Sequence, residues 1–226
     1  MSKQAILDNV KASLQANPLA TQSSHYVNPM KSTNTDKIQE YITLQNANKA
    51  IVIESSPDAL IQDIHKALVE AQAHKILYNL NIKDTCNIES LRGLKDTDSM
   101  EFIAYEKSVD ENRAQLFQID TSIIHANCGV ANLGVIGIAS HKNAPRLSSL
   151  ITRTCIVLLK KSTIVPHFYD GVCALKAQSE NGILPTNMIF IAGPSRTADI
   201  ELQTVFGVHG SLRTYVILYY LLKEHI

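Results

Sequence analysis

The feature that most constrains the fold is the alternation of short β-branched runs with segments of helical periodicity from residue 49 onward. Buried strands of a parallel sheet are short and apolar, whereas connecting helices place apolar residues three or four positions apart. Leu60, Ile64 and Leu68 have the helical spacing, and Pro166 is suited to open another helix that runs to about Ala177. The predicted strands are AIVIE (50–54), KILYNL (75–80), TCIVLLKK (154–161), NMIFIAG (187–193) and TYVILYY (214–220). These repeated units predict an α/β fold with a mainly parallel, helix-covered sheet.

The first part of the chain has a different pattern. Apolar residues between positions 6 and 14 recur at helical spacing and predict an amphipathic helix. Residues 18–34 are polar and turn-rich, and residues 34–47 predict a second helix. The expected organisation is an N-terminal helical extension and linker over residues 1–48, followed by one α/β domain over residues 49–226.

Composition narrows the functional class. Of the 226 residues 45% are hydrophobic, which is enough for one sizeable core. Lys and Arg together number 21 and so do Asp and Glu, and this balance argues against a protein that coats nucleic acid or an anionic membrane. No apolar run approaches the roughly 20 residues that span a bilayer. We therefore expect a cytoplasmic protein with no membrane insertion and no nucleic-acid partner.

The four cysteines are widely spaced and form no CxxC pair. An iron–sulfur cluster or structural zinc site within this chain is therefore not expected, and no metal ligands are assigned. Cysteines with this distribution are typical of small buried residues in a reducing compartment. Cys128 beside Gly129 stays open as a lone nucleophile, although no His–Asp arrangement can be linked to it from the sequence.

Residues 192–201, AGPSRTADIE, follow a predicted strand and lead into a predicted helix over 197–206. Two interpretations stay open for this turn. In the first, Ser195 or Thr197 caps the helix, and Asp199 and Glu201 complement the helix dipole. In the second, the turn holds an anion on the first helical amides and on the guanidinium of Arg196.

Two glycine-bearing segments accompany this turn. GVHG (207–210) predicts a sharp bend that directs His209 toward the sheet, either as a structural residue or as a group that titrates in the physiological range. The segment GVANLGVIG (129–137) has no dinucleotide-loop spacing, and it fits a strand–turn packing or a wall that approaches a ligand at Gly134.

The set GPSRTADIE and GVHGS, preceded by VANLGVIGIA and by APRLSSLITRTCIVLLKKSTIV, resembles the lactate-utilisation protein C family (LutC/YkgG), whose shared region is the LUD domain. The resemblance extends over about residues 50–220 and is tightest over 128–212. It implies a three-layer α/β/α arrangement similar to the NagB/RpiA/CoA-transferase-like fold. It also implies a subunit of a system that oxidises L-lactate to pyruvate with two iron–sulfur partner proteins, which would carry the clusters. Whether this chain catalyses a step, as a component of an L-lactate dehydrogenase complex, stays open.

The composition of the turn at 193–197, together with the resemblance, suggests a candidate site that binds a small anionic ligand. Its ligand-binding candidates are Gly193, Pro194, Ser195, Arg196, Thr197, Gly134 and Asn132, and its weak catalytic candidates are His209, Asp199 and Glu201. One segment departs from the family pattern. The family's middle motif typically reads Ala-Glu-Thr-Gly-Thr, whereas this chain has ANLGV over residues 131–135, so its acid and both hydroxyls are replaced.

Two other functions remain as alternatives. The first is a free-standing enzyme of the CoA-transferase-like fold that acts on CoA- or phosphate-bearing substrates, for which Glu201 would be the nucleophile. The second is a non-catalytic binding or regulatory module, in which the turn at 193–197 only caps a helix.

Overall fold

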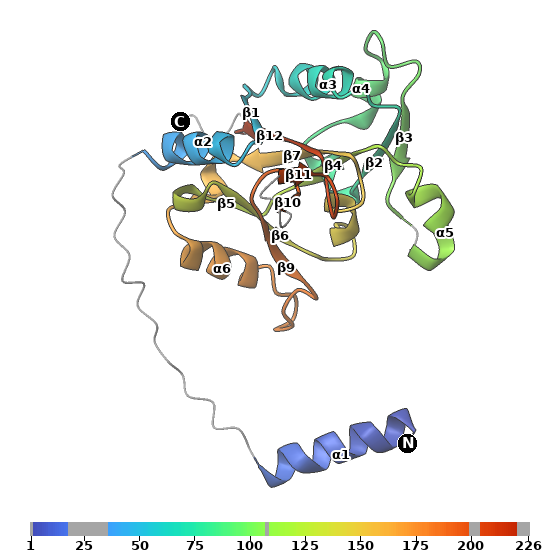
Figure 1. The fold of residues 1–226 in the computed structure, drawn as a ribbon, viewed down its shortest axis with the longest axis vertical. Coiled ribbons are helices and arrows are strands. Elements are labelled where there is room, and N and C mark those ends of the chain that lie inside the picture. The colour runs from blue at the N-terminus through green and yellow to red at the C-terminus, as the bar shows by residue number, and fades with distance from the viewer. Residues whose placement is uncertain (1, 18–35, 107–108, 199–203, 221–226) are drawn as a thin grey trace. The chain divides into compact units, whose positions relative to one another are not determined.

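The computed structural model describes residues 2–17, 36–106, 109–198 and 204–220 of the chain (Figure 1). The chain divides into two compact units, Met1–Lys31 and Ser32–Ile226. The first unit contains helix α1 (Lys3–Ala16), which confirms the amphipathic helix predicted there. The hydroxyl of Ser2 accepts a hydrogen bond from the Ala5 amide and caps the start of this helix.

A parallel six-stranded sheet lies at the centre of the second unit, with strand order β1-β12-β7-β4-β2-β3 (Figure 1). Its strands are β1 (Ile51–Glu54), β2 (Lys75–Tyr78), β3 (Glu101–Ala104), β4 (Thr121–His125), β7 (Thr154–Lys160) and β12 (Arg213–Tyr219). Four of them, β1, β2, β7 and β12, correspond to predicted runs. The α/β class with a mainly parallel central sheet is therefore confirmed.

Alternate residues of the central strands pack into two different cores. In β7, Ile156 and Leu158 face a core that includes residues of helices α3 (Leu60–Glu70) and α4 (Ile88–Arg92). Val157 and Leu159 face the opposite core, which the second sheet covers. Helix α5 (Val109–Leu116) lies between β3 and β4 in the chain. Both faces of the sheet are covered, which explains the near-continuous apolar runs of the central strands.

The second sheet has four strands in the order β8-β5-β6-β9. Strand β6 runs antiparallel to both β5 and β9, whereas β5 and β8 are parallel. Helix α6 (Phe168–Lys176) packs on this sheet through Leu175. The strands are β5 (Cys128–Val130), β6 (Val135–Ala139), β8 (Ile164–Val165) and β9 (Met188–Ile191). The run over 187–193 is thus a strand, but it belongs to this mixed sheet rather than to the parallel one.

Helix α2 (Lys37–Ala47) packs on the α/β unit, because its Tyr41 side chain is fully buried among residues of the second core. The compact unit accordingly begins before residue 49, where the sequence places the start of the α/β domain. The C-terminal end of this helix reaches the segment around Gly134, which is important for the candidate site.

The predicted helix over 197–206 is wrong. Arg196–Ala198 forms strand β10 and Thr204–Phe206 forms strand β11, and these pair antiparallel as a separate two-stranded sheet. Threonine, valine and phenylalanine favour this extended conformation over a helix. Residues 199–203, which include the candidates Asp199 and Glu201, lie outside the described residues.

Candidate functional site

The two C-terminal motifs that the sequence singles out lie directly against each other. The Ser195 amide donates a hydrogen bond to the Ser211 carbonyl at 2.8 Å, and the Gly207 amide donates to the Ser195 carbonyl, also at 2.8 Å. No helix begins at residues 193–197, so the anion-binding mechanism based on helical amides does not apply here. The turn instead leads from β9 into β10, and Gly193 adopts a positive φ of 67° within it.

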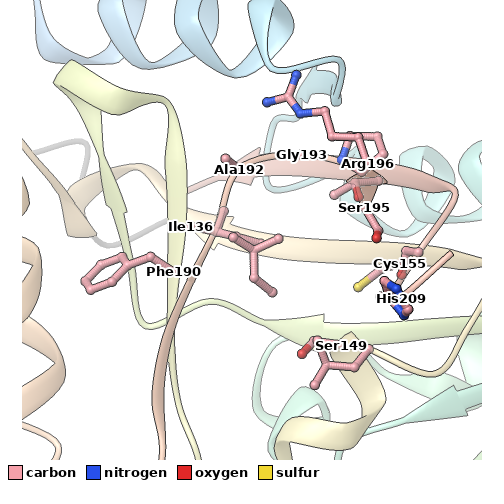
Figure 2. Close-up of a pocket in the computed structure, with 15 residues that line it drawn as sticks. Ile136, Ser149, Cys155, Phe190, Ala192, Gly193, Ser195, Arg196 and His209 are labelled. Carbon is pink, nitrogen blue, oxygen red and sulfur yellow. The ribbon is translucent and has the colours of Figure 1, made fainter. Parts of the chain in front are cut away.

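A cavity of about 330 Å³ opens beside these two turns (Figure 2). Five of the predicted site residues line it, namely Gly193, Pro194, Ser195, Arg196 and His209. In Figure 2 the Ser195 hydroxyl points toward the side of the cavity where Cys155 and His209 lie. The other lining residues are Ile136, Ser149, Leu150, Cys155, Phe190, Ile191, Ala192, Gly210, Ser211 and Thr214. The cavity therefore combines hydroxyl-bearing and cationic residues with an apolar wall, as small-molecule sites do.

Three predicted ligand-binding residues do not line this cavity. Thr197 pairs with Val205 in the antiparallel strand pair β10–β11. The backbone N–H of Asn132 donates a hydrogen bond to the Pro166 carbonyl at 3.1 Å. Gly134 turns the chain between β5 and β6 with a φ of 57°, and a Cβ at this position would collide with the backbone of Leu44 and Gln45. The structure thus gives Gly134 a packing role against helix α2.

Asn48, at the C-terminal end of helix α2, joins the two predicted motifs. Its side-chain amide donates to the Leu133 carbonyl at 2.9 Å and to the Gly134 carbonyl at 2.8 Å. Its amide oxygen accepts a hydrogen bond from Arg196 Nη2 at 3.2 Å. Figure 2 shows the Arg196 side chain extended toward a helix, away from the other labelled side chains. The sequence analysis did not identify Asn48. Its partners Leu133 and Arg196 lie 85 and 148 residues away in the chain, and the residues next to Asn48 give no sign of these contacts.

Gly193 depends on the same residue. The Asn48 carbonyl lies so close to Gly193 that any Cβ there would collide with it. Glycine is therefore required at this position both by the positive φ and by the close approach of the backbone. The sequence suggests that Gly193 contacts a ligand, whereas its close contact with Asn48 already accounts for a glycine at this position.

Replacing Asn48 with alanine should lower the free energy of unfolding by about 2 kcal/mol, because two backbone carbonyls would lose their donor. Arg196→Ala, which removes one exposed hydrogen bond, should lower it by less than about 1 kcal/mol. Urea titration of the two variants measures both effects. Equal losses of unfolding free energy in the two variants would show that Asn48 stabilises the fold mainly through its hydrogen bond with Arg196, and not through its bonds to the Leu133 and Gly134 carbonyls.

The thiols of the described sheets are poor nucleophiles. Cys128 is fully buried, and burial raises the pKa of its thiol to about 11. Burial also raises the pKa of the cavity-lining Cys155 thiol to about 11, against a smaller opposing effect of its hydrogen bond with Ser122. Both thiols stay protonated at neutral pH, so the structure argues against the lone-nucleophile interpretation of Cys128.

Within the described ranges, no three His, Cys, Asp or Glu residues are grouped so that they could hold a metal ion. The described helices also include none that is long and apolar enough to cross a membrane.

Comparison with known proteins identifies the fold and its relatives. The family model of the LUD domain matches residues 38–219. A solved structure of a DUF162 family protein from Deinococcus radiodurans aligns with a TM-score of 0.57 at 18% identity, over 84% of this chain and 99% of that one. At this level of identity the likeness shows the fold alone.

Curated relatives match at higher identity over shorter lengths. An uncharacterized protein of Neisseria meningitidis is 37% identical over 129 residues, which are 57% of this chain and 54% of the relative. Proteins named lactate utilization protein C are 35% identical in Bacillus pumilus, over 50% of this chain and 48% of that one, and 33% identical in Bacillus subtilis, over 48% and 46%. The chain spans about half the length of the curated relatives it matches.

Proposed function

Because the chain belongs to the LUD-domain family, we propose that it is a cytoplasmic subunit of an L-lactate utilisation system. In this system, L-lactate is oxidised to pyruvate with two iron–sulfur partner proteins, and this chain contributes a cavity for a small anionic ligand. The observation that carries the proposal is the family match over residues 38–219, together with relatives that are named lactate utilization protein C. The clusters belong to the partners in this proposal, because the four cysteines are widely separated in the sequence.

The described lining of the cavity contains no carboxylate, which is compatible with an anionic ligand. Arg196 lines the cavity through its backbone end, while its guanidinium extends toward helix α2 and donates to Asn48 (Figure 2). Ser195 and Ser211 also line the cavity, and their hydroxyls can donate hydrogen bonds to a ligand. A ligand with a negative group is therefore favoured over a cationic one.

Co-purification tests the partnership. The chain, tagged and expressed from its own chromosome during growth on L-lactate, should retain two proteins that contain iron and acid-labile sulfide. The Asn48→Ala variant, which loses the hydrogen bonds of Asn48 with Leu133, Gly134 and Arg196, serves as a destabilised comparison. A tagged chain that is folded and abundant yet retains no iron–sulfur protein would contradict the proposed partnership.

A further inference from the structure

Strand β9 lies at one end of the second sheet, where β6 pairs with one of its two edges (Figure 1). The Ser140 amide donates to the Asn187 carbonyl at 2.9 Å, which fixes the alternation of hydrogen bonds in this antiparallel pair. Met188 and Phe190 therefore direct their backbone N–H and C=O groups away from β6. Among the described residues, no group forms a hydrogen bond with these outward groups.

Strand β9 carries none of the features that usually protect the edge of a sheet. Such edges are normally blocked by a charged residue, a proline, a bulge or a very short strand. Of the other outer strands of the two larger sheets, β1 contains Glu54, β3 contains Glu101, and β8 has only two residues. Residues 181–195 contain no charged side chain, and the register of β9 with β6 is continuous. An apolar edge of this kind is suited to pair with another strand.

Apolar side chains beside this edge extend the surface that another strand would contact. All four β9 residues are partly exposed, whereas the residues of β6 are buried. Phe168, at the start of helix α6, is 45% exposed, and its ring centroid lies 4.7 Å from that of Phe190. Ile183 and Leu184, which precede the strand, are 73% and 50% exposed. Covering these side chains would remove apolar surface from water and stabilise an association.

The outward groups of β9 are complementary to those of a second, identical strand. In an antiparallel pairing centred on Ile189, the N–H and C=O of Met188 face the C=O and N–H of Phe190 of the partner subunit. The two-fold axis repeats this contact, so every outward group of both strands is paired. Because residues 181–195 are uncharged, the two copies meet without like-charge repulsion. Selection of a different protein by complementary charge has no basis at this edge.

We propose that two copies of this chain associate through β9, which pairs antiparallel about Ile189 and joins the two four-stranded sheets into one continuous sheet. Phe190 and Ile191 also line the cavity of the candidate site, so the pairing brings the partner subunit to one side of that cavity. The paired strands are short, and we therefore expect a reversible dimer. The dimer depends on neither the ligand nor the iron–sulfur proteins of the proposed function.

Sedimentation velocity of the full chain over a range of concentrations measures this association, and amide hydrogen exchange by NMR gives a local readout. The wild type should shift from one chain to two as the concentration rises. The Met188 and Phe190 amides should exchange fast in the dilute protein and become protected when the dimer forms. The Ile189 amide, which faces β6, should be protected at every concentration.

Charged substitutions at Thr186 and Ala192 provide matched variants. Both residues are exposed and lie just outside the strand, and the proposed register places Thr186 opposite Ala192 of the partner subunit. Thr186→Lys combined with Ala192→Lys puts like charges across the interface and should abolish the dimer. Thr186→Lys combined with Ala192→Glu puts opposite charges there and should keep it. Both double variants should melt close to the wild-type temperature, because neither side chain is buried.

A wild type that stays a single chain at every concentration would overturn the proposed dimer, and so would equal dimerisation of the two double variants. Protection of the Met188 and Phe190 amides only after another protein is added would also overturn it, and would assign the edge to that protein. A chain that fails to dimerise can still retain iron–sulfur proteins in co-purification, so the dimer and the proposed function fail separately.

Discussion

Gly134→Ala is expected to lower the free energy of unfolding by about 3 kcal/mol, one of the largest effects of any conservative substitution near the site. Gly134 adopts a φ of 57°, a conformation that costs a residue with a Cβ about 1 kcal/mol. The added methyl would also collide with the backbone of helix α2 at Leu44 and Gln45, so the helix would have to move. Because Asn48 follows that helix, the movement would also disturb the turn at Gly193.

Gly182→Ala separates the two causes. Gly182 has a similar positive φ of 75°, but a Cβ added there would have no heavy atom within 4 Å, so only the conformational cost of about 1 kcal/mol remains. Urea titration of both variants measures the difference. Similar losses for the two variants would show that contact between Gly134 and helix α2 is unimportant.

Acidification from pH 7 to pH 5 should remove about 2 kcal/mol of stability through His125 alone. Burial lowers the pKa of this imidazole to about 4 from 6.5, against a smaller opposing effect of Asp84. The Tyr219 ring lies 6.1 Å from it, and its Nε2 has no partner among the described residues, which suits the neutral form. The unfolded chain takes up a proton near pH 6.5 and the folded chain only near pH 4. Lowering the pH from 7 to 5 therefore lowers the free energy of unfolding.

The His125→Gln variant identifies the source of this pH dependence. Glutamine has no titrating group, so the variant should lose about 2 kcal/mol less than the wild type between pH 7 and pH 5. Urea titrations of both proteins at the two pH values give the comparison. A loss of equal size in both proteins would assign the effect to other groups.

Four strands of the central sheet could be predicted, most clearly β7 and β12, which are buried on both faces. Ile156 to Leu159 contribute to both cores and therefore form an uninterrupted apolar run. The second sheet could not be predicted in this way. Strand β5 has three residues and β8 has two, and the order of the sheet depends on pairings between distant segments. Local pattern carries little information about such pairings.

The antiparallel strands β10 and β11 show why one motif was misread. A Ser or Thr followed by acidic residues is typical of a helix start, but the same hydroxyl residues suit a strand. Here Arg196 and Thr197 pair with Phe206 and Val205, and this tertiary context overrides the local signal. Of the two apolar residues that replace the family's hydroxyls, Val135 is buried at 8% exposure, whereas Leu133 is 44% exposed.

The candidate site was predicted in part. Composition indicated that the turns at 193–196 and 207–210 are unusual, and the structure brings them together around one cavity. Asn48 and Ser211 were missed, because each acquires its importance from contacts with a distant segment. Thr197, Asn132 and Gly134 remain predictions as ligand-binding residues, and they lie outside the wall of that cavity.

Growth of a deletion strain on L-lactate tests the central claim most directly. The gene would be deleted in a strain that lacks other lactate-oxidising enzymes, and growth on L-lactate and on glucose would be compared. The account predicts that growth on L-lactate is lost, that growth on glucose is kept, and that a plasmid copy of the wild-type gene restores the loss. Normal growth of the deletion strain on L-lactate would contradict a role of this chain in lactate utilisation.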